Sequence, residues 1–459
     1  MDLSTNRLKN RSGKLFTIIV AFMLVLPMLF TGCDSDETEV YTALTQDDVE
    51  VKLYRYRPAD DAPFRTDCQP VLLMGGMGMN INEFLPHTTD KMKDVYAKME
   101  LPTPLPDWAV GDEYIQKDHL LLYNLGYYLW QKGYDPWFGN LRGIGREPVK
   151  SEAGIKQTNI DVFACLDVPA MVDKISEVTG MKPMVGGHST GATATYMYLT
   201  GAYMDIDEVM AGKNADPTYL PHVKISDDLA KARNRAINGF IAIDPASIPP
   251  LPEYLDFDLL WTIANAPMVL PLDSLMQMML VDCPSTRMVM SSFMATMFDA
   301  ISDYAMDHEA IEWLHFFETD NIDPYVFDHY MRYAVGNMSL RIVSQYADWG
   351  LNMVVREHYT NGVANKDLVK APPRAAGDGY TYYEDHMDNI TTPTICALSD
   401  YNGLVAAQTV LDYVMGLKTP HAMDHHFIMP DTAHADLPCG RTAATVLFPA
   451  IGDWIDQMQ

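Results

Sequence analysis

Short apolar runs, most of them bounded by glycine, proline or polar residues, recur along most of the chain. Between several of them, at residues 120–132 and 162–178, apolar residues are spaced by three and four, as on one face of a helix. Continuous apolar runs that alternate with such helices are typical of strands buried on both faces, so we predict a doubly wound, mostly parallel sheet. The predicted strands are 69–79, 134–139, 182–187, 239–244, 392–398 and 425–429.

The alternation stops between residues 244 and 392. This stretch has mostly helical spacing and is rich in methionine and aromatic residues, which predicts a helical cap at 246–386 inserted between strands 6 and 7. The sheet domain is then split into 49–245 and 387–459. The methionines have two interpretations: they pack the cap, or they form an adaptable surface for acyl chains.

The first 32 residues have the pattern of an export signal, with four basic residues before an apolar run at 15–30. A run of 16 residues is shorter than the roughly 20 that a spanning helix needs, so we expect cleavage. The run leads into Phe30-Thr31-Gly32-Cys33, which resembles the bacterial lipobox, although an ordinary signal peptide with a chance cysteine is the alternative. The resemblance implies a lipid on Cys33 and a lipoprotein of the bacterial cell envelope, facing periplasm or exterior. The acidic segment 33–48 reads as a flexible tether.

The charge of the chain excludes one class of partner. With 33 basic and 61 acidic residues, the formal net charge is -28, which repels phosphate backbones, so we expect no nucleic-acid partner. The six cysteines include no pair with the spacing of a zinc or redox motif, and we expect neither a metal nor a disulfide framework.

A candidate nucleophile lies in Gly187-His188-Ser189-Thr190-Gly191, between an apolar run and a helical stretch at 192–202. Strand, tight turn and helix are the context of a nucleophile elbow, in which small flanking residues allow a strained turn that exposes the serine hydroxyl. We predict Ser189 as the nucleophile. For the oxyanion hole, the predicted donors are the backbone amides of Thr190 and of Met77, in the glycine-rich turn 75–78.

The base must come late in the chain, because in this fold the order is serine, acid, histidine. His434 lies in a loop between the last apolar run and a closing helix at 443–458, and is the predicted base. The acid is left open. Counting along the loop after the seventh strand puts it at Asn402, which cannot stabilise a charged histidine. Asp244, at the end of the sixth strand, and Asp400 are the two alternatives, and Asp244 is preferred because it leaves the following helix in register.

Several of these segments together resemble the acid lipase family, the gastric and lysosomal acid lipases and their bacterial relatives. The resemblance implies an α/β-hydrolase fold and a serine hydrolase for apolar carboxylic esters, with a lid and no cofactor. Gly75 departs from the histidine usual in the oxyanion turn, and Asn402 from the usual aspartate. Asn140 and Arg142 are interpreted as residues that fix a loop. The segments are 133–143, 166–172, 187–191, 328–336 and 434–436.

Three functions are compatible with this pattern. The leading interpretation is a lipase or carboxylesterase acting on apolar acyl esters through a serine, histidine and aspartate triad. An acyltransferase or thioesterase would use the same triad with another acceptor. A catalytically inactive lipid-binding lipoprotein would keep the apolar pocket, and Asn402 is the feature that favours it.

The lipid anchor gives a first prediction. Each buried methylene contributes about 0.8 kcal/mol to membrane binding and stable anchoring takes two chains, which a diacylated cysteine supplies. Cys33→Ala should therefore abolish palmitate labelling and leave the chain unprocessed or release it from membranes, as measured by metabolic labelling and membrane fractionation. Unchanged processing and unchanged labelling would contradict the assignment of Cys33.

Overall fold

The computed structural model describes residues 39–152, 158–215, 219–250, 269–280, 287–306, 315–362, 374, 378–401 and 403–459. The predicted signal peptide, Cys33 and Asn402 lie outside the described residues. Within these ranges, no helix combines the length and the apolar character needed to cross a bilayer.

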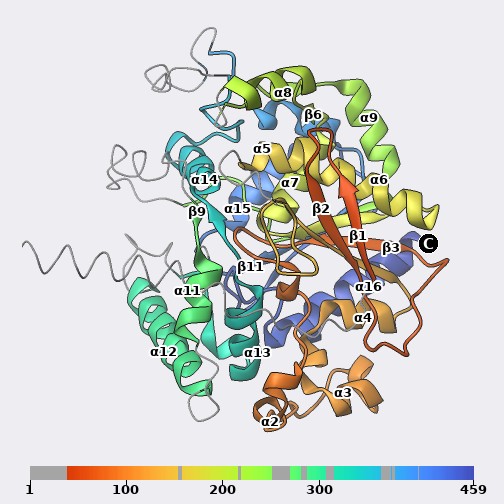
Figure 1. The fold of residues 1–459 in the computed structure, drawn as a ribbon, viewed down its shortest axis with the longest axis vertical. Helices are drawn as coiled ribbons and strands as arrows, with labels where there is room; N and C mark the ends of the chain where they lie inside the picture. The colour runs from red at the N-terminus through yellow and green to blue at the C-terminus, as the bar shows by residue number, and fades with distance from the viewer. Residues whose placement is uncertain are drawn as a thin grey trace, which may run out of the picture. The chain divides into compact units, whose positions relative to one another are not determined.

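A twisted sheet forms the centre of the described chain (Figure 1). Among the described residues it has eight strands, in the order β1-β2-β4-β3-β5-β8-β11-β12. The β1–β2 hairpin is antiparallel, β2 is antiparallel to β4, and all other neighbours are parallel. All six predicted strands are therefore confirmed, in a mostly parallel sheet. The strands are β1 (Glu39–Leu44), β2 (Glu50–Arg55), β3 (Pro70–Met74), β4 (Asp135–Asn140), β5 (Met184–His188), β8 (Gly239–Ile243), β11 (Thr394–Ser399) and β12 (His425–Met429).

Helices cover both faces of the sheet, as a doubly wound fold requires (Figure 1). Strand β8 is an example of a strand buried on both faces. Its Ile241 and Ile243 belong to one apolar core, and its Phe240 and Ala242 belong to the other. Helices α4 and α16 contribute to the first core, and α6 and α7 to the second. These and other helices of the sheet domain are α2 (Lys93–Tyr96), α3 (Glu113–Lys117), α4 (Leu125–Gln131), α5 (Ile160–Val162), α6 (Val168–Thr179), α7 (Thr190–Leu199), α8 (Ile206–Ala215), α9 (Asp227–Ala236), α15 (Ala407–Val410) and α16 (Phe448–Met458).

The segment expected to be a tether is instead part of the sheet from Glu39 onward, so the predicted boundary at 48 is wrong. Residues Glu39–Leu44 form β1, whose Ala43 is buried, and Asp47 in the following turn is buried too. Acidic composition suggested a solvated linker. The available signal was in the partner strand β2, where apolar Val51 and Leu53 alternate with Lys52 and Tyr54.

The insertion between β8 and β11 is mostly helical in its described part, at the predicted place between the sixth and seventh strands of the sheet. Its methionine-rich helix α12 packs on α13, where Phe298 contacts Phe327. Met294 of α12 is buried, whereas Phe293 and Met297 are exposed. Packing of the cap is therefore confirmed for Met294, and a role of the exposed side chains in binding acyl chains stays a prediction. The elements are β9 (Val269–Leu270), α11 (Leu272–Met279), α12 (Arg287–Met306), α13 (Pro324–His329), β10 (Met338–Ser339) and α14 (Leu340–Asn352).

A buried ion network fixes the loop after β4. The guanidinium of Arg142 binds both carboxylate oxygens of Asp47, at 2.8 and 3.0 Å, and its Nε donates to Asp167 at 2.7 Å. Burial alone would lower the pKa of Arg142, but the two carboxylates outweigh burial and raise it. Nearby, Asn140 accepts from the Ile81 amide and donates to the Val149 carbonyl. The interpretation of Asn140 and Arg142 as loop-fixing residues is confirmed.

We predict that Arg142→Met lowers the free energy of unfolding by about 3–5 kcal/mol, because it leaves Asp47 and Asp167 buried without their cation. Urea unfolding followed by circular dichroism measures this. Lys224→Met is the matched control, because it removes an exposed lysine paired with Asp205 and Glu208 and should leave the unfolding midpoint unchanged. Equal midpoints for both variants would show that the network does not hold the fold.

Candidate active site

Ser189 occupies a sharp turn between β5 and α7. Its backbone has φ +49° and ψ −116°, a strained conformation for a residue with a side chain. The flanking glycines are required by packing, since a Cβ atom at Gly187 or Gly191 would overlap the carbonyl oxygen of Met74 at the end of β3. The chain thus forms the predicted nucleophile elbow, with Ser189 at its tip.

His434 lies between Ser189 and Asp244. Its Nε2 is 2.9 Å from Ser189 Oγ, and its Nδ1 is 2.7 Å from Asp244 Oδ2. Asp244 directly follows β8, is fully buried, and also accepts hydrogen bonds from the amide and hydroxyl of Ser399, at 3.0 and 2.7 Å. These donors hold the carboxylate in the orientation that faces the imidazole.

Of the two candidate acids, the structure brings Asp244 and not Asp400 to the histidine. Asp400 is exposed, and its amide donates to the carbonyl of Thr432. Asp244 is directed inward because its own amide donates to Ala397 of the neighbouring strand β11, at 2.7 Å. The alternative of Asp400 as the partner of His434 is therefore corrected.

Burial determines the ionisation of His434. Burial lowers the pKa of the imidazole, the hydrogen bond that His434 donates to Asp244 raises it, and the neighbouring His188 lowers it further. The ring is thus neutral at pH 7. A neutral ring that donates Nδ1–H to Asp244 presents the lone pair of Nε2 to the Ser189 hydroxyl, which is the state that a general base needs.

The predicted oxyanion donors lie on either side of Ser189. Thr190 is the first residue of α7, so its amide is among those without an acceptor inside the helix. The turn with Met77 passes close by, because a Cβ atom at Gly76 would lie 3.2 Å from Ser189 Cβ. Packing explains why residue 75 is glycine and not the usual histidine, since a Cβ atom there would lie 2.9 Å from the carboxylate of Glu83. The roles of the Met77 and Thr190 amides stay predictions.

The sequence analysis missed a buried pair behind the site, Glu83 and His188. Glu83, in the 3-10 turn η2 (Ile81–Glu83), accepts from the Gly76 amide at 2.9 Å and lies 2.7 Å from Nδ1 of His188. The other ring nitrogen of His188 is 2.9 Å from the backbone carbonyl of His434. A histidine inside the elbow motif was the available signal, but its partner is 105 residues earlier in the chain.

A second buried carboxylate, Asp436, fixes the loop that carries His434. It accepts from the amides of Ala433 and Glu318 and from the side chain of Asn321. Burial raises the pKa of Asp436 to about 7. Because Glu318 and Asn321 belong to the insertion, this carboxylate ties the histidine loop to the cap.

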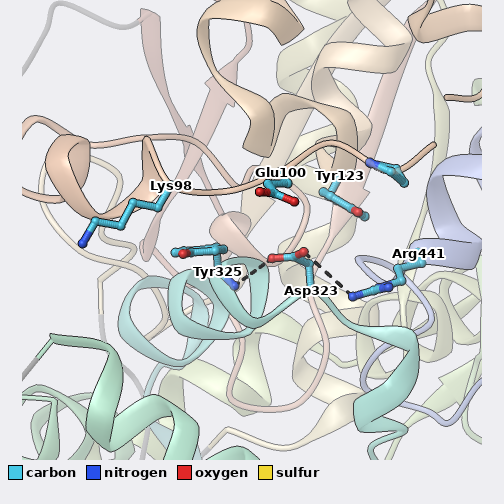
Figure 2. A pocket seen from close by; sticks show the side chains of 7 residues that line it. Lys98, Glu100, Tyr123, Asp323, Tyr325 and Arg441 are labelled. Atoms are coloured by element: carbon cyan, nitrogen blue, oxygen red, sulfur yellow. Dashed lines mark hydrogen bonds and ion pairs between the residues drawn. The ribbon is translucent and has the colours of Figure 1, made fainter. Parts of the chain in front are cut away.

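A pocket at the surface is separate from this site. Figure 2 shows Asp323 facing Tyr325 and Arg441, with Lys98, Glu100 and Tyr123 around it. The Asp323 side chain accepts from the Tyr325 amide at 2.9 Å and lies 3.9 Å from Arg441. None of Ser189, His434 and Asp244 lines the pocket. Among the described residues, no group of three or more histidine, cysteine or acidic side chains is arranged to hold a metal.

Comparison with known proteins gives one local and many distant likenesses. No family model matches the chain. A segment of 74 residues is 35% identical to Lipase lipl-3 of Caenorhabditis elegans, which is 15% of this chain and 18% of that lipase. The chain thus matches less than a fifth of the length of this curated relative, a likeness too short to assign the acid lipase family.

Solved structures resemble nearly the whole chain at low identity. A membrane phospholipase A, described as a bacterial virulence factor, has 11% identity over 98% of this chain and 96% of that one, with a TM-score of 0.43. A monoglyceride lipase of Saccharomyces cerevisiae has 13% identity over 94% and 98%, with a TM-score of 0.43. A thioesterase domain from the curacin biosynthetic pathway has 12% over 91% and 99%, with a TM-score of 0.40.

The fold is that of an α/β-hydrolase. The strand order, the antiparallel second strand, the elbow after β5 and the helical insertion after β8 carry this assignment, as the resemblance in the sequence implied. The solved structures are too distant to transfer a substrate or a reaction to this chain.

Proposed function

We propose that this α/β-hydrolase is a serine carboxylic ester hydrolase, a lipase or esterase, with Ser189 as nucleophile, His434 as general base and Asp244 as the acid. The observation that carries the proposal is His434, whose two ring nitrogens face Ser189 Oγ at 2.9 Å and Asp244 Oδ2 at 2.7 Å. Geometry of this kind defines a triad whatever the order of its members in the chain.

The arrangement implies a two-step reaction. His434 removes the hydroxyl proton as Ser189 Oγ attacks the ester carbonyl carbon, and the amides of Thr190 and Met77 donate to the resulting oxyanion. The tetrahedral intermediate collapses to an acyl-enzyme, and the alcohol leaves with the proton from His434. Water then repeats the sequence and releases the carboxylic acid. No step requires a metal or cofactor.

An apolar acyl ester is the substrate class that the chain favours. The net charge of -28 disfavours anionic substrates in solution. The cap presents apolar side chains well beyond those that pack it, among them exposed Met278, Phe293 and Met297 on α11 and α12. Attachment to a bacterial envelope membrane through Cys33 would bring the enzyme to lipid esters.

The triad assignment predicts opposite outcomes for the two aspartates. Asp244→Asn should lower kcat by roughly 10³ to 10⁴ with the fold intact, because His434 loses its orienting charge. Asp400→Asn, the matched control, should stay within a few-fold of the wild type because Asp400 is exposed and does not reach the histidine. Hydrolysis of p-nitrophenyl esters and labelling by a fluorophosphonate probe measure both, with Ser189→Ala as the unlabelled reference.

Two results would contradict this proposal. If the wild-type chain is neither labelled by the fluorophosphonate nor able to hydrolyse any ester, Ser189 is not an activated nucleophile. If both aspartate variants keep full turnover, His434 is oriented without a carboxylate. Labelling without hydrolysis, together with transfer of the acyl group to an added alcohol or thiol, would identify an acyltransferase instead.

The apolar cap predicts a preference for long acyl chains. Values of kcat/KM should rise from acetyl to decanoyl esters of the same alcohol, because each added methylene that reaches apolar surface contributes about 0.8 kcal/mol to transition-state binding. The measurement is a panel of p-nitrophenyl esters below their micelle concentrations. A flat or falling series would show that the methionine-rich helices only pack the cap.

A further inference from the structure

Both ring nitrogens of His188 face hydrogen-bond acceptors. Nδ1 lies 2.7 Å from Glu83 Oε1, and Nε2 lies 2.9 Å from the backbone carbonyl oxygen of His434. A carbonyl oxygen can only accept, so Nε2 must carry a proton. The other neighbours of the Glu83 carboxylate are hydrogen-bond donors. Oε2 accepts from the Gly76 amide at 2.9 Å, and Oε1 accepts from the Tyr330 hydroxyl at 3.4 Å. Each carboxylate oxygen of Glu83 thus accepts from a neighbouring donor, so Nδ1 of His188 must also donate.

Burial makes a neutral His188 ring energetically unfavourable. The side chains of His188 and Glu83 are 3% and 0% exposed, so water cannot replace a missing hydrogen bond. A neutral ring would direct one nitrogen lone pair at an acceptor, and two buried acceptors facing each other are strongly unfavourable. The oxyanion turn also confines the ring, since a Cβ atom at Gly76 would lie 3.2 Å from Nδ1.

We propose that His188 is a permanently protonated positioning residue, which joins the oxyanion turn to the loop of His434 through Glu83 and keeps a second proton off His434. The inference rests on the proposed function, because it matters only if His434 is the general base. His188 does not touch the reacting atoms. It acts through the backbone that it holds and through its charge.

The positive charge lies close enough to affect the base. The rings of His188 and His434 are 4.6 Å apart between centroids, and two adjacent cations repel. The groups that act on His188 are Glu83 from η2, and His434 and Asp244 from the triad, while Tyr330 from the cap contacts Glu83. Burial alone would lower the pKa of His188, but Glu83 and then Asp244 outweigh it and raise the pKa. In return, His188 lowers the pKa of His434.

Glu83→Gln removes the charges and keeps the hydrogen bonds. The glutamine carbonyl can accept from the Gly76 amide, and its amide can donate to Nδ1 of a neutral His188, which still donates Nε2–H to His434. A purely structural role of the pair would therefore survive the substitution. Tyr330→Phe is the matched control, because it removes a neutral hydroxyl from the same carboxylate and leaves both charges.

The first readout is the pH dependence of kcat/KM, whose acidic limb reports the pKa of the free base. Loss of the imidazolium raises the pKa of His434, so activity should fall off at a pH higher than in the wild type. We expect a displacement of roughly half a unit, because the opposing charge of Glu83 is lost at the same time. Tyr330→Phe should keep the wild-type limb. An unchanged limb in a folded Glu83→Gln variant would overturn the electrostatic role.

The second readout does not need turnover. In the full chain with 15N-labelled histidines, NMR should show His188 with both nitrogens protonated from pH 6 to pH 8, and as the neutral Nε2–H tautomer in Glu83→Gln; the signal is assigned by its loss in His188→Gln. A neutral His188 in the wild type over this range would overturn the inference. An inactive and unlabelled wild type with a protonated His188 would instead contradict the proposed function alone.

Discussion

The carbonyl oxygen of Met74 occupies the space that side chains at Gly187 and Gly191 would need. The end of β3 therefore lies directly against the end of β5 and the start of α7, closer than any other residue type would allow. This backbone approach brings the glycine-rich turn 75–78, which follows Met74, beside Ser189, which β5 and α7 hold in a strained conformation. Every other element of the site is arranged around that contact.

The elements buried on both faces of the sheet could be predicted from sequence, because a parallel strand between two helical layers must be apolar along its whole length. The β1–β2 hairpin could not be predicted from the same signal. It lies at the edge of the sheet, β2 alternates between buried and half-buried positions, and β1 lies within an acidic segment that suggested a linker. Composition over a long window thus hid the alternation over the six residues of β2.

The site residues also divide into those that the sequence predicts and those that it does not. Ser189 and His434 are marked by local context, the turn motif and the loop before the last helix. The acid was left open because strand register decides it: Asp244 and Asp400 follow neighbouring strands, and only the hydrogen bonds across β8 and β11 direct one of them inward. Glu83 and His188 escaped because their partnership is made by tertiary packing alone. A glutamate at the end of an asparagine-capped turn carries no sign of a partner more than a hundred residues away.

The hydrogen bonds of Asp436 mean that the cap cannot be exchanged as an independent unit. This carboxylate binds the amide of Ala433 in the histidine loop, and also Glu318 and Asn321 in the insertion, while the amide of Ala435 donates to the Phe316 carbonyl. The segment 316–321 of the insertion therefore also supports the loop that carries His434. An engineer who exchanged the whole insertion for that of another hydrolase would also remove the supports of the histidine. A chimera should therefore keep this segment and exchange only the part of the insertion that precedes it, which contains helices α11 and α12.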